Sequence, residues 1–327
     1  MKKIMAVVTA EPVYSERFSD YVNGSGAFLL RAKPFPTPEA VFEYQKDHGT
    51  GSVPIMICDE MLLAGGGDPG PSGTQILLLS ETGRGGTLRK YQSGQALLSG
   101  ILNACADRGL SFASPSSGRE LKIYAVRGIG CPLGRLRFSL ALSRMLSRRQ
   151  KTVYLDLREF SGLRCLTGKI SERGLSTAIY YLKQGKLDGG RLMGLLEEFG
   201  GISYLPPVTS AEDVEMMDGN DMERLFGMFS EETSVGCIVA ELPDSPSVSL
   251  EMMERSEKIF FVHTDDPAEK EAVSVFREML GNAGREDLLE KIIVTDIAGE
   301  STKGPGTGID GLIYSETGEM VRRALEI

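Results

Sequence analysis

The chain has 327 residues, which is enough for about two domains. Hydrophobic residues make up 41% of it and charged residues 25%, a balance typical of globular proteins rather than disordered ones. The formal net charge of −9 argues against a general nucleic-acid binder, which would carry a basic excess. Five cysteines without a C-x-x-C pair and only two histidines argue against a structural zinc site or a disulfide framework.

The first half alternates short apolar runs with more polar stretches. The runs that predict buried strands are Ile4–Val8, Val53–Cys58 and Ile76–Leu79, and those that favour helices are Pro38–Lys46 and Gln95–Ala106. Strands that alternate with helices indicate βαβ units and a parallel sheet. Because Glu11 and Pro12 follow the first run at once, it predicts a strand rather than a signal peptide.

A small-residue stretch, Ser111–Arg119, separates two patterned halves. The boundaries that we expect are a first domain at 1–112, a linker at 113–119 and a second domain at 120–327. After the linker the pattern restarts with a strand at Leu121–Val126, a glycine-bearing turn at Gly128–Gly134 and a helix at Leu136–Arg149. Further strands are predicted at Thr152–Leu155, Gly236–Ala240, Ile259–Val262 and Lys291–Val294, with a helix at Ala268–Leu280.

The glycine-bearing turn reads Arg127-Gly-Ile-Gly-Cys-Pro-Leu-Gly-Arg-Leu-Arg137. In a strand–turn–helix unit, backbone N–H groups and the helix N-terminus can bind an anion, although such a turn can also be purely structural. The turn also resembles a dinucleotide-binding fingerprint, because it contains Gly128, Gly130 and Gly134 and is followed some 20 residues later by Asp156. The sequence of the turn alone is compatible with an anion site, a structural turn and a dinucleotide site.

The flanking segment, Lys122–Gly162, resembles the opening βαβ unit of the MinD/ParA ATPases, and most closely their TadZ/CpaE-like pilus-assembly branch. In that family the first strand leads into a G-K-G-G-V-G-K-T-T loop. Tyr204–Asp213 and Cys237–Pro243 resemble later segments of the branch, the second being its Walker B strand. The resemblance covers most of residues 120–327 and implies a P-loop NTPase-like domain with a mostly parallel sheet.

The resemblance places the nucleotide-binding positions on residues of altered chemistry. Aligned on Gly134, Leu133 falls on the loop valine, Arg135 on the Walker lysine, Leu136 on the Mg²⁺-binding hydroxyl and Arg137 on the following threonine. Cys131 and Pro132 replace two loop glycines, and Gly130 replaces the family's second lysine. Glu241 falls on the Walker B acid, and Asp156 on the first acid of a D-x-D-like motif or, equally, on a strand-end cap.

These changes disfavour phosphoryl transfer. Pro132 lacks a backbone N–H, and Leu136 cannot bind Mg²⁺. Arg135 keeps the positive charge, but its planar guanidinium group need not fit a phosphate-binding loop that accommodates a lysine ammonium. We therefore expect ATP or ADP to bind weakly at most, Mg²⁺ binding to be disfavoured, and hydrolysis by the usual mechanism to be absent.

Residues 1–110 resemble a receiver domain, which implies a flavodoxin-like fold. The positions that match a receiver's phosphorylation site are Asp59, Ser80 and Lys90. Lys90 begins the motif Lys90-Tyr-Gln-Ser93. Thr9 and Ala10 stand where a receiver carries its acidic pair, and only Glu11 is nearby. We expect a protein-interaction module, with phosphorylation of Asp59 as the alternative.

We therefore expect an α/β protein of two doubly wound domains that acts as a scaffold or localisation protein for a pilus or secretion machine. The alternatives are an active Mg²⁺-ATPase with atypical loop residues and a receiver-type signalling protein. Expected partners are a second copy of the chain, in a homodimer, and proteins of the machine, with no specific nucleic acid. No apolar stretch approaches the ~20 residues that cross a bilayer. We accordingly expect a cytoplasmic protein with peripheral membrane or polar recruitment at most.

Overall fold

The computed structural model describes residues 3–25, 28–63, 73–110, 112, 120–168, 171, 173–297 and 308–325. The chain divides into two compact units. The first comprises Met1–Pro115, Asp188–Gly194 and Glu232–Ser234, and the second comprises the remainder. The expected linker at 113–119 lies outside the described residues.

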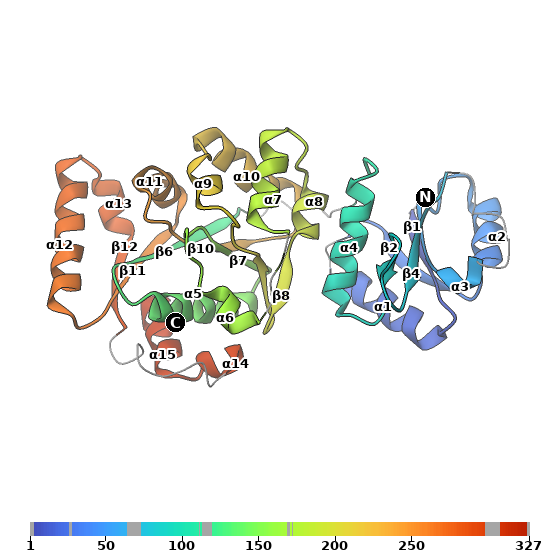
Figure 1. The fold of residues 1–327 in the computed structure, drawn as a ribbon, viewed down its shortest axis with the longest axis horizontal. Coiled ribbons are helices and arrows are strands. Elements are labelled where there is room, and N and C mark those ends of the chain that lie inside the picture. The colour runs from blue at the N-terminus through green and yellow to red at the C-terminus, as the bar shows by residue number, and fades with distance from the viewer. Residues whose placement is uncertain are drawn as a thin grey trace. The chain divides into compact units, whose positions relative to one another are not determined.

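The first unit is built on a five-stranded parallel sheet of order β2-β1-β3-β4-β5, one of the two common doubly wound orders. Its strands are β1 Ile4–Val8, β2 Arg31–Phe35, β3 Ile55–Asp59, β4 Gln75–Ser80 and β5 Leu88–Arg89. Its helices are α1 Pro12–Ser25, α2 Pro38–His48, α3 Glu60–Leu63, α4 Gly94–Ala106 and α8 Gly189–Gly194. Every residue of β1 and β3 is buried, as their apolar runs predict, and α2 and α4 cover opposite faces (Figure 1).

The second unit contains a seven-stranded sheet of order β12-β11-β6-β10-β7-β9-β8, parallel except for β8 against β9. The strands are β6 Lys122–Gly128, β7 Thr152–Asp156, β8 Glu197–Phe199, β9 Ile202–Leu205, β10 Cys237–Glu241, β11 Lys258–His263 and β12 Ile292–Asp296. The longer helices are α5 Pro132–Ser147, α7 Leu175–Lys183, α10 Gly219–Glu232, α11 Pro246–Arg255, α12 Pro267–Asn282 and α15 Glu316–Leu325. Shorter ones are α6 Leu163–Thr167, α9 Ala211–Glu215, α13 Glu286–Lys291 and α14 Ile309–Leu312. The expected α/β class with a mostly parallel sheet is confirmed.

The carboxyl ends of three neighbouring strands meet at the centre of this sheet. Glu241, the last residue of β10, is in register with Val126 of β6 and with Asp156 at the end of β7. The chain leaves β6 for α5 on one face of the sheet and leaves β10 for α11 on the other (Figure 1). Ligands of doubly wound sheets bind at such a switch point, outside the carboxyl ends of the strands.

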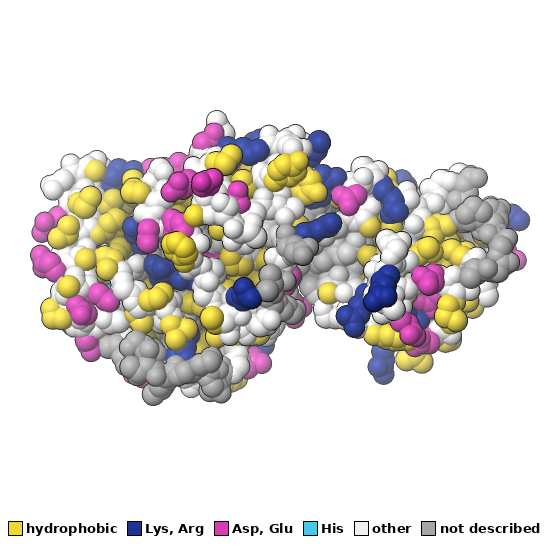
Figure 2. Space-filling model, in the orientation of Figure 1, with side chains coloured by type: hydrophobic (Ala, Val, Ile, Leu, Met, Phe, Trp, Pro, Cys, Tyr) yellow, Lys and Arg dark blue, Asp and Glu magenta, His cyan; other side chains and the backbone are white. Residues whose placement is uncertain are grey.

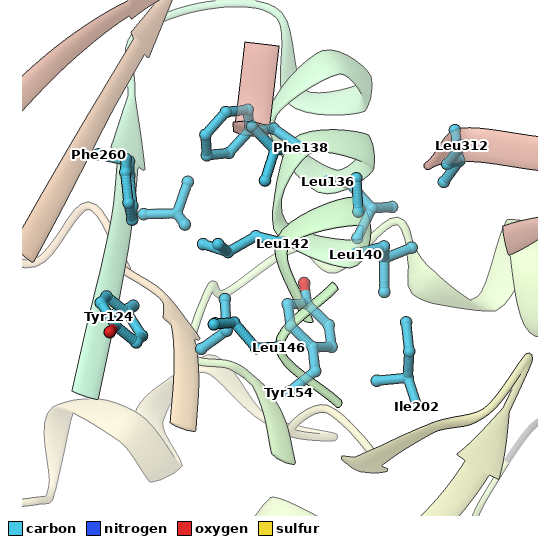
Figure 3. Close-up of a cluster of buried hydrophobic side chains, with 14 of the residues drawn as sticks. Tyr124, Leu136, Phe138, Leu140, Leu142, Leu146, Tyr154, Ile202, Phe260 and Leu312 are labelled. Carbon is cyan, nitrogen blue, oxygen red and sulfur yellow. The ribbon is translucent and has the colours of Figure 1, made fainter. Parts of the chain in front are cut away.

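Helix α5 lies in the core of the second unit rather than on its surface. Every one of its residues from Gly134 to Ser143 is buried, which is typical of a helix enclosed on all sides. Figure 3 shows Leu136 and Leu140 directed toward Leu312, while Phe138 points toward Phe260, with 5.6 Å between the ring centroids. The beginning of α5 is therefore fixed by packing.

Among the described residues, no helix is both long enough and apolar enough to cross a bilayer. The last helix, α15, buries Val321 and Ala324 and packs against α5.

The close approach of β6 to β11 gives a test of this packing. In Gly128→Ala the new Cβ would lie 2.6 Å from the Val262 carbonyl oxygen and 2.7 Å from its Cγ2. We expect this overpacking to lower the free energy of unfolding by about 1–3 kcal/mol, measured by urea denaturation. Gly227→Ala in α10 is the matched control, because nothing lies within 4 Å of its added methyl group. The control should raise the free energy of unfolding by about 0.5–1 kcal/mol, and equal effects would contradict the packing.

Candidate functional site

The turn after β6 is shorter than the sequence predicts. Strand β6 ends at Gly128 and α5 begins at Pro132, so the turn consists of residues 129–131 and the helix begins four residues before the predicted Leu136. Proline at the first helical position favours this early start. The Arg135 N–H donates to the Cys131 carbonyl oxygen at 3.1 Å, inside the first helical turn. That N–H is therefore not available to a phosphate.

The outer side of the turn faces an acid. Gly130 has a φ of 66°, and a Cβ added there would meet the Glu269 Oε1 atom at 1.8 Å. Glu269 is held in place because its Oε2 accepts the Thr264 backbone N–H at 2.6 Å and the Thr264 hydroxyl at 2.8 Å. A carboxylate against the turn repels an incoming anion. The sequence analysis did not identify Glu269, although its place in the first turn of a helix after Asp266-Pro267 is typical of a capping residue.

Arg135 points into the protein rather than into solvent. Its Nε donates to Glu241 Oε1 at 2.9 Å and its Nη1 donates to the Gly128 carbonyl oxygen at 2.8 Å. The residue is only 8% exposed, and Glu241 is fully buried. The side chain that falls on the Walker lysine therefore pairs with the one that falls on the Walker B acid.

A second arginine completes the group. Arg158 Nε lies 2.9 Å from Glu241 Oε1, and its Nη2 lies 2.9 Å from Asp156 Oδ2. Asp156 is fully buried and also accepts the Ser161 hydroxyl at 2.5 Å. We call Arg135, Arg158, Asp156 and Glu241 the arginine–acid cluster. Two cations here balance two anions at the carboxyl ends of β7 and β10.

Every carboxylate oxygen of the arginine–acid cluster has a partner, because Tyr154 donates its hydroxyl to Glu241 Oε2 at 2.7 Å. Burial and the charge of Asp156 raise the pKa of Glu241, whereas Arg158, Arg135 and the Tyr154 hydroxyl lower it. Burial alone would lower the pKa of Arg158, but Glu241 and Asp156 raise it above its usual value. The Arg158 guanidinium therefore stays charged where it lies.

The remaining predicted residues do not complete a nucleotide site. Leu136 belongs to the hydrophobic core and Arg137 is buried in α5, whereas Pro132 is exposed and Cys131 and Leu133 are half-buried. Gly134 packs against the Ile297 side chain. In the described part of the chain, no group of three or more His, Cys, Asp or Glu side chains could hold a metal ion. The residues present do not fit a magnesium nucleotide.

The first unit brings two of its three predicted residues together. Lys90 Nζ lies 2.8 Å from Asp59 Oδ2 and 3.0 Å from Glu11 Oε1, and Asp59 Oδ2 also accepts the Ala10 N–H at 2.8 Å. Ser80 instead bonds Thr87 Oγ1 at 2.6 Å, within the β4–β5 connection. The Lys90 ammonium thus lies between the two acids.

The chain is similar to solved structures of ParA- and MinD-type P-loop ATPases. A plasmid partition protein from Borrelia burgdorferi has a TM-score of 0.46 and 13% identity, with 64% of this chain and 99% of that chain covered. A ParA family ATPase from Chlorobium tepidum has a TM-score of 0.45 and 13% identity, with 64% and 81% covered. The cell division ATPase MinD of Pyrococcus furiosus has a TM-score of 0.43 and 13% identity, with 63% and 99% covered. No protein-family model and no curated protein matches the chain.

Removing one acid from the arginine–acid cluster tests its electrostatics. Glu241→Gln keeps the shape but leaves two buried guanidinium groups facing a single carboxylate, so we expect the free energy of unfolding to fall by about 3–5 kcal/mol. The matched control is Glu257→Gln, which breaks the exposed pair with Lys122 and should change stability by less than about 1 kcal/mol. Chemical denaturation of both variants provides the comparison. Equal stability of Glu241→Gln and the native chain would mean that the cluster is not ionised.

Proposed function

We propose that this chain is a scaffold or localisation protein that does not hydrolyse nucleotide. The observation that supports this most strongly is the arginine–acid cluster, which occupies the switch point of the second sheet with side chains of the chain itself. Magnesium requires near-ideal octahedral oxygen coordination, and the acids that could supply oxygens are already bound to arginine. An architecture of the ATPase type with this interior suits binding to proteins better than phosphoryl transfer.

The role that we infer is assembly or polar placement of a pilus or secretion machine, in the manner that the resemblance to the TadZ/CpaE-like branch implies. The second unit would serve as the platform for homodimerisation. The first unit, receiver-like in strand order, would serve as an interaction surface. In it the Lys90 ammonium already forms ion pairs with both Asp59 and Glu11, the residues that would otherwise be available to a cation.

The charge of the chain supports protein partners rather than nucleic acid. The formal net charge is −9, and Figure 2 shows basic and acidic side chains interspersed on the visible face of each unit. A nucleic-acid surface would concentrate lysine and arginine along one stripe or face. Any association with a membrane would then be peripheral and mediated by partners.

Titration calorimetry with ATP and ADP, with and without Mg²⁺, tests the loss of nucleotide chemistry. We expect no saturable heat at millimolar nucleotide, because Arg135 is engaged by Glu241 and the Arg135 N–H by the Cys131 carbonyl oxygen. A MinD- or ParA-type ATPase with an intact loop is the positive control. Micromolar binding with Mg²⁺-dependent phosphate release, lost in Glu241→Gln, would instead establish an active ATPase.

The cellular role has a separate test. We expect the fluorescently labelled chain to form discrete foci that coincide with the machine it serves, because a scaffold concentrates where its partners are. Deletion should reduce the number of assembled pili or secretion complexes, and the native gene should restore it. A diffuse distribution together with unchanged assembly would contradict the proposed role.

A further inference from the structure

The second unit has an open cavity next to the arginine–acid cluster. It lies beyond the carboxyl ends of β7 and β9 and measures about 360 Å³. One wall carries Phe160, Leu163 and Arg164, and the other carries Tyr204, Pro206 and Pro207. This volume falls within the range of pockets that bind ligands, and the position is the edge of the sheet at which doubly wound folds bind them.

The first wall is held rigid by the arginine–acid cluster. Asp156 accepts the Ser161 hydroxyl at 2.5 Å, and Ser161 Oγ in turn accepts the Leu163 N–H at 3.2 Å. Arg158 is bound to both acids of the cluster. The loop that carries Phe160 is therefore fixed on both sides of that residue.

The second wall is fixed by backbone packing. The Leu175 N–H donates to the Pro206 carbonyl oxygen at 2.8 Å, and a Cβ at Gly174 would meet the same oxygen at 2.3 Å. No side chain fits at residue 174 while Pro206 keeps this position. Both walls are thus formed before any ligand arrives, which reduces the entropy lost on binding.

Two side chains at the rim have the chemistry of binding residues. Phe160 is 89% exposed although its loop is rigid. Arg164 is exposed, and no acid of the described residues lies within ion-pair distance of its guanidinium group. Glu159, on the same rim, accepts the Asp244 backbone N–H at 3.5 Å. Aromatic and arginine side chains carry much of the binding energy in protein interfaces.

We propose that this cavity binds a short segment of a partner protein in which an acidic residue stands next to an aromatic or leucine residue. The apolar side chain enters between Leu163, Tyr204 and Pro207 and contacts the ring of Phe160, while the carboxylate pairs with Arg164. A cavity of about 360 Å³ takes one or two side chains rather than a folded surface, and Arg164, which has no acid partner among the described residues, selects an acid. The inference rests on the proposed scaffold role only in taking a protein as the ligand.

The test is selection of random dodecapeptides, displayed on phage, against the full-length chain. We expect the selected peptides to carry Asp or Glu within two positions of Phe, Tyr, Trp or Leu. Binding of a synthetic selected peptide, measured by fluorescence anisotropy, should weaken about 10- to 100-fold in Phe160→Ala and in Arg164→Ala. Because both residues are exposed, the unfolding curves should not change.

Met279→Ala and Arg323→Ala are the matched controls, since each truncates an exposed side chain of similar type on another helix. Selected peptides without the acidic–apolar pairing, or equal binding by Phe160→Ala and the native chain, would overturn the proposal. So would a shift from dimer to monomer in Phe160→Ala during sedimentation, because a second copy would then occupy the cavity. Nucleotide titration is independent of these outcomes, so a chain that bound both peptide and Mg²⁺-ATP would contradict the scaffold role alone.

Discussion

The ion pairs of Arg135 and Arg158 with Glu241 and Asp156 are the constraint on which the second unit depends. Taking such charges out of water costs several kcal/mol per ion, and the cost is offset only when the partners are close and every oxygen is hydrogen-bonded. Both conditions hold here. The Tyr154 hydroxyl donates to the Glu241 oxygen that neither arginine binds, and the Ser161 hydroxyl donates to an Asp156 oxygen that Arg158 also binds. The four groups must therefore remain together, and the carboxyl ends of β7 and β10 are held with them.

The same constraint explains how the beginning of α5 differs from a phosphate-binding loop. Pro132 begins the helix early, which places the Arg135 N–H in a helical hydrogen bond and directs its side chain toward the sheet. One residue later, Leu136 packs in the core, as Figure 3 shows. Glu269 then lies against Gly130 on the outer side. Each of these changes disfavours the binding of a phosphate at this turn.

The fold class was predictable because it depends on local patterns. Apolar runs such as Ile4–Val8 and Val53–Cys58 coincide closely with buried strands, whereas β5, with only two residues, has no pattern to detect. The sequence also showed that residues of the candidate site, such as Pro132 and Leu136, lack the groups that bind phosphate and Mg²⁺. The pairing within the site was not predictable, since Arg135 and Glu241 are 106 positions apart and meet only through the register of β6 with β10. Arg158 and Glu269 were not identified as site residues, because the contacts of Arg158 with Glu241 and of Glu269 with Gly130 likewise join residues far apart in the chain.

A closed ion network also determines how such a protein can be regulated. A ligand shifts a conformational equilibrium only as far as its affinities for the two states differ. In a nucleotide switch, phosphate and metal supply that difference, but here both guanidinium groups are bound by acids of the same chain. In the proposed scaffold role, the affinity of the second unit for a partner would then be constant, and its occupancy would follow the local concentration and valency of the partners. In that role, placement would be an equilibrium of binding rather than a cycle driven by hydrolysis.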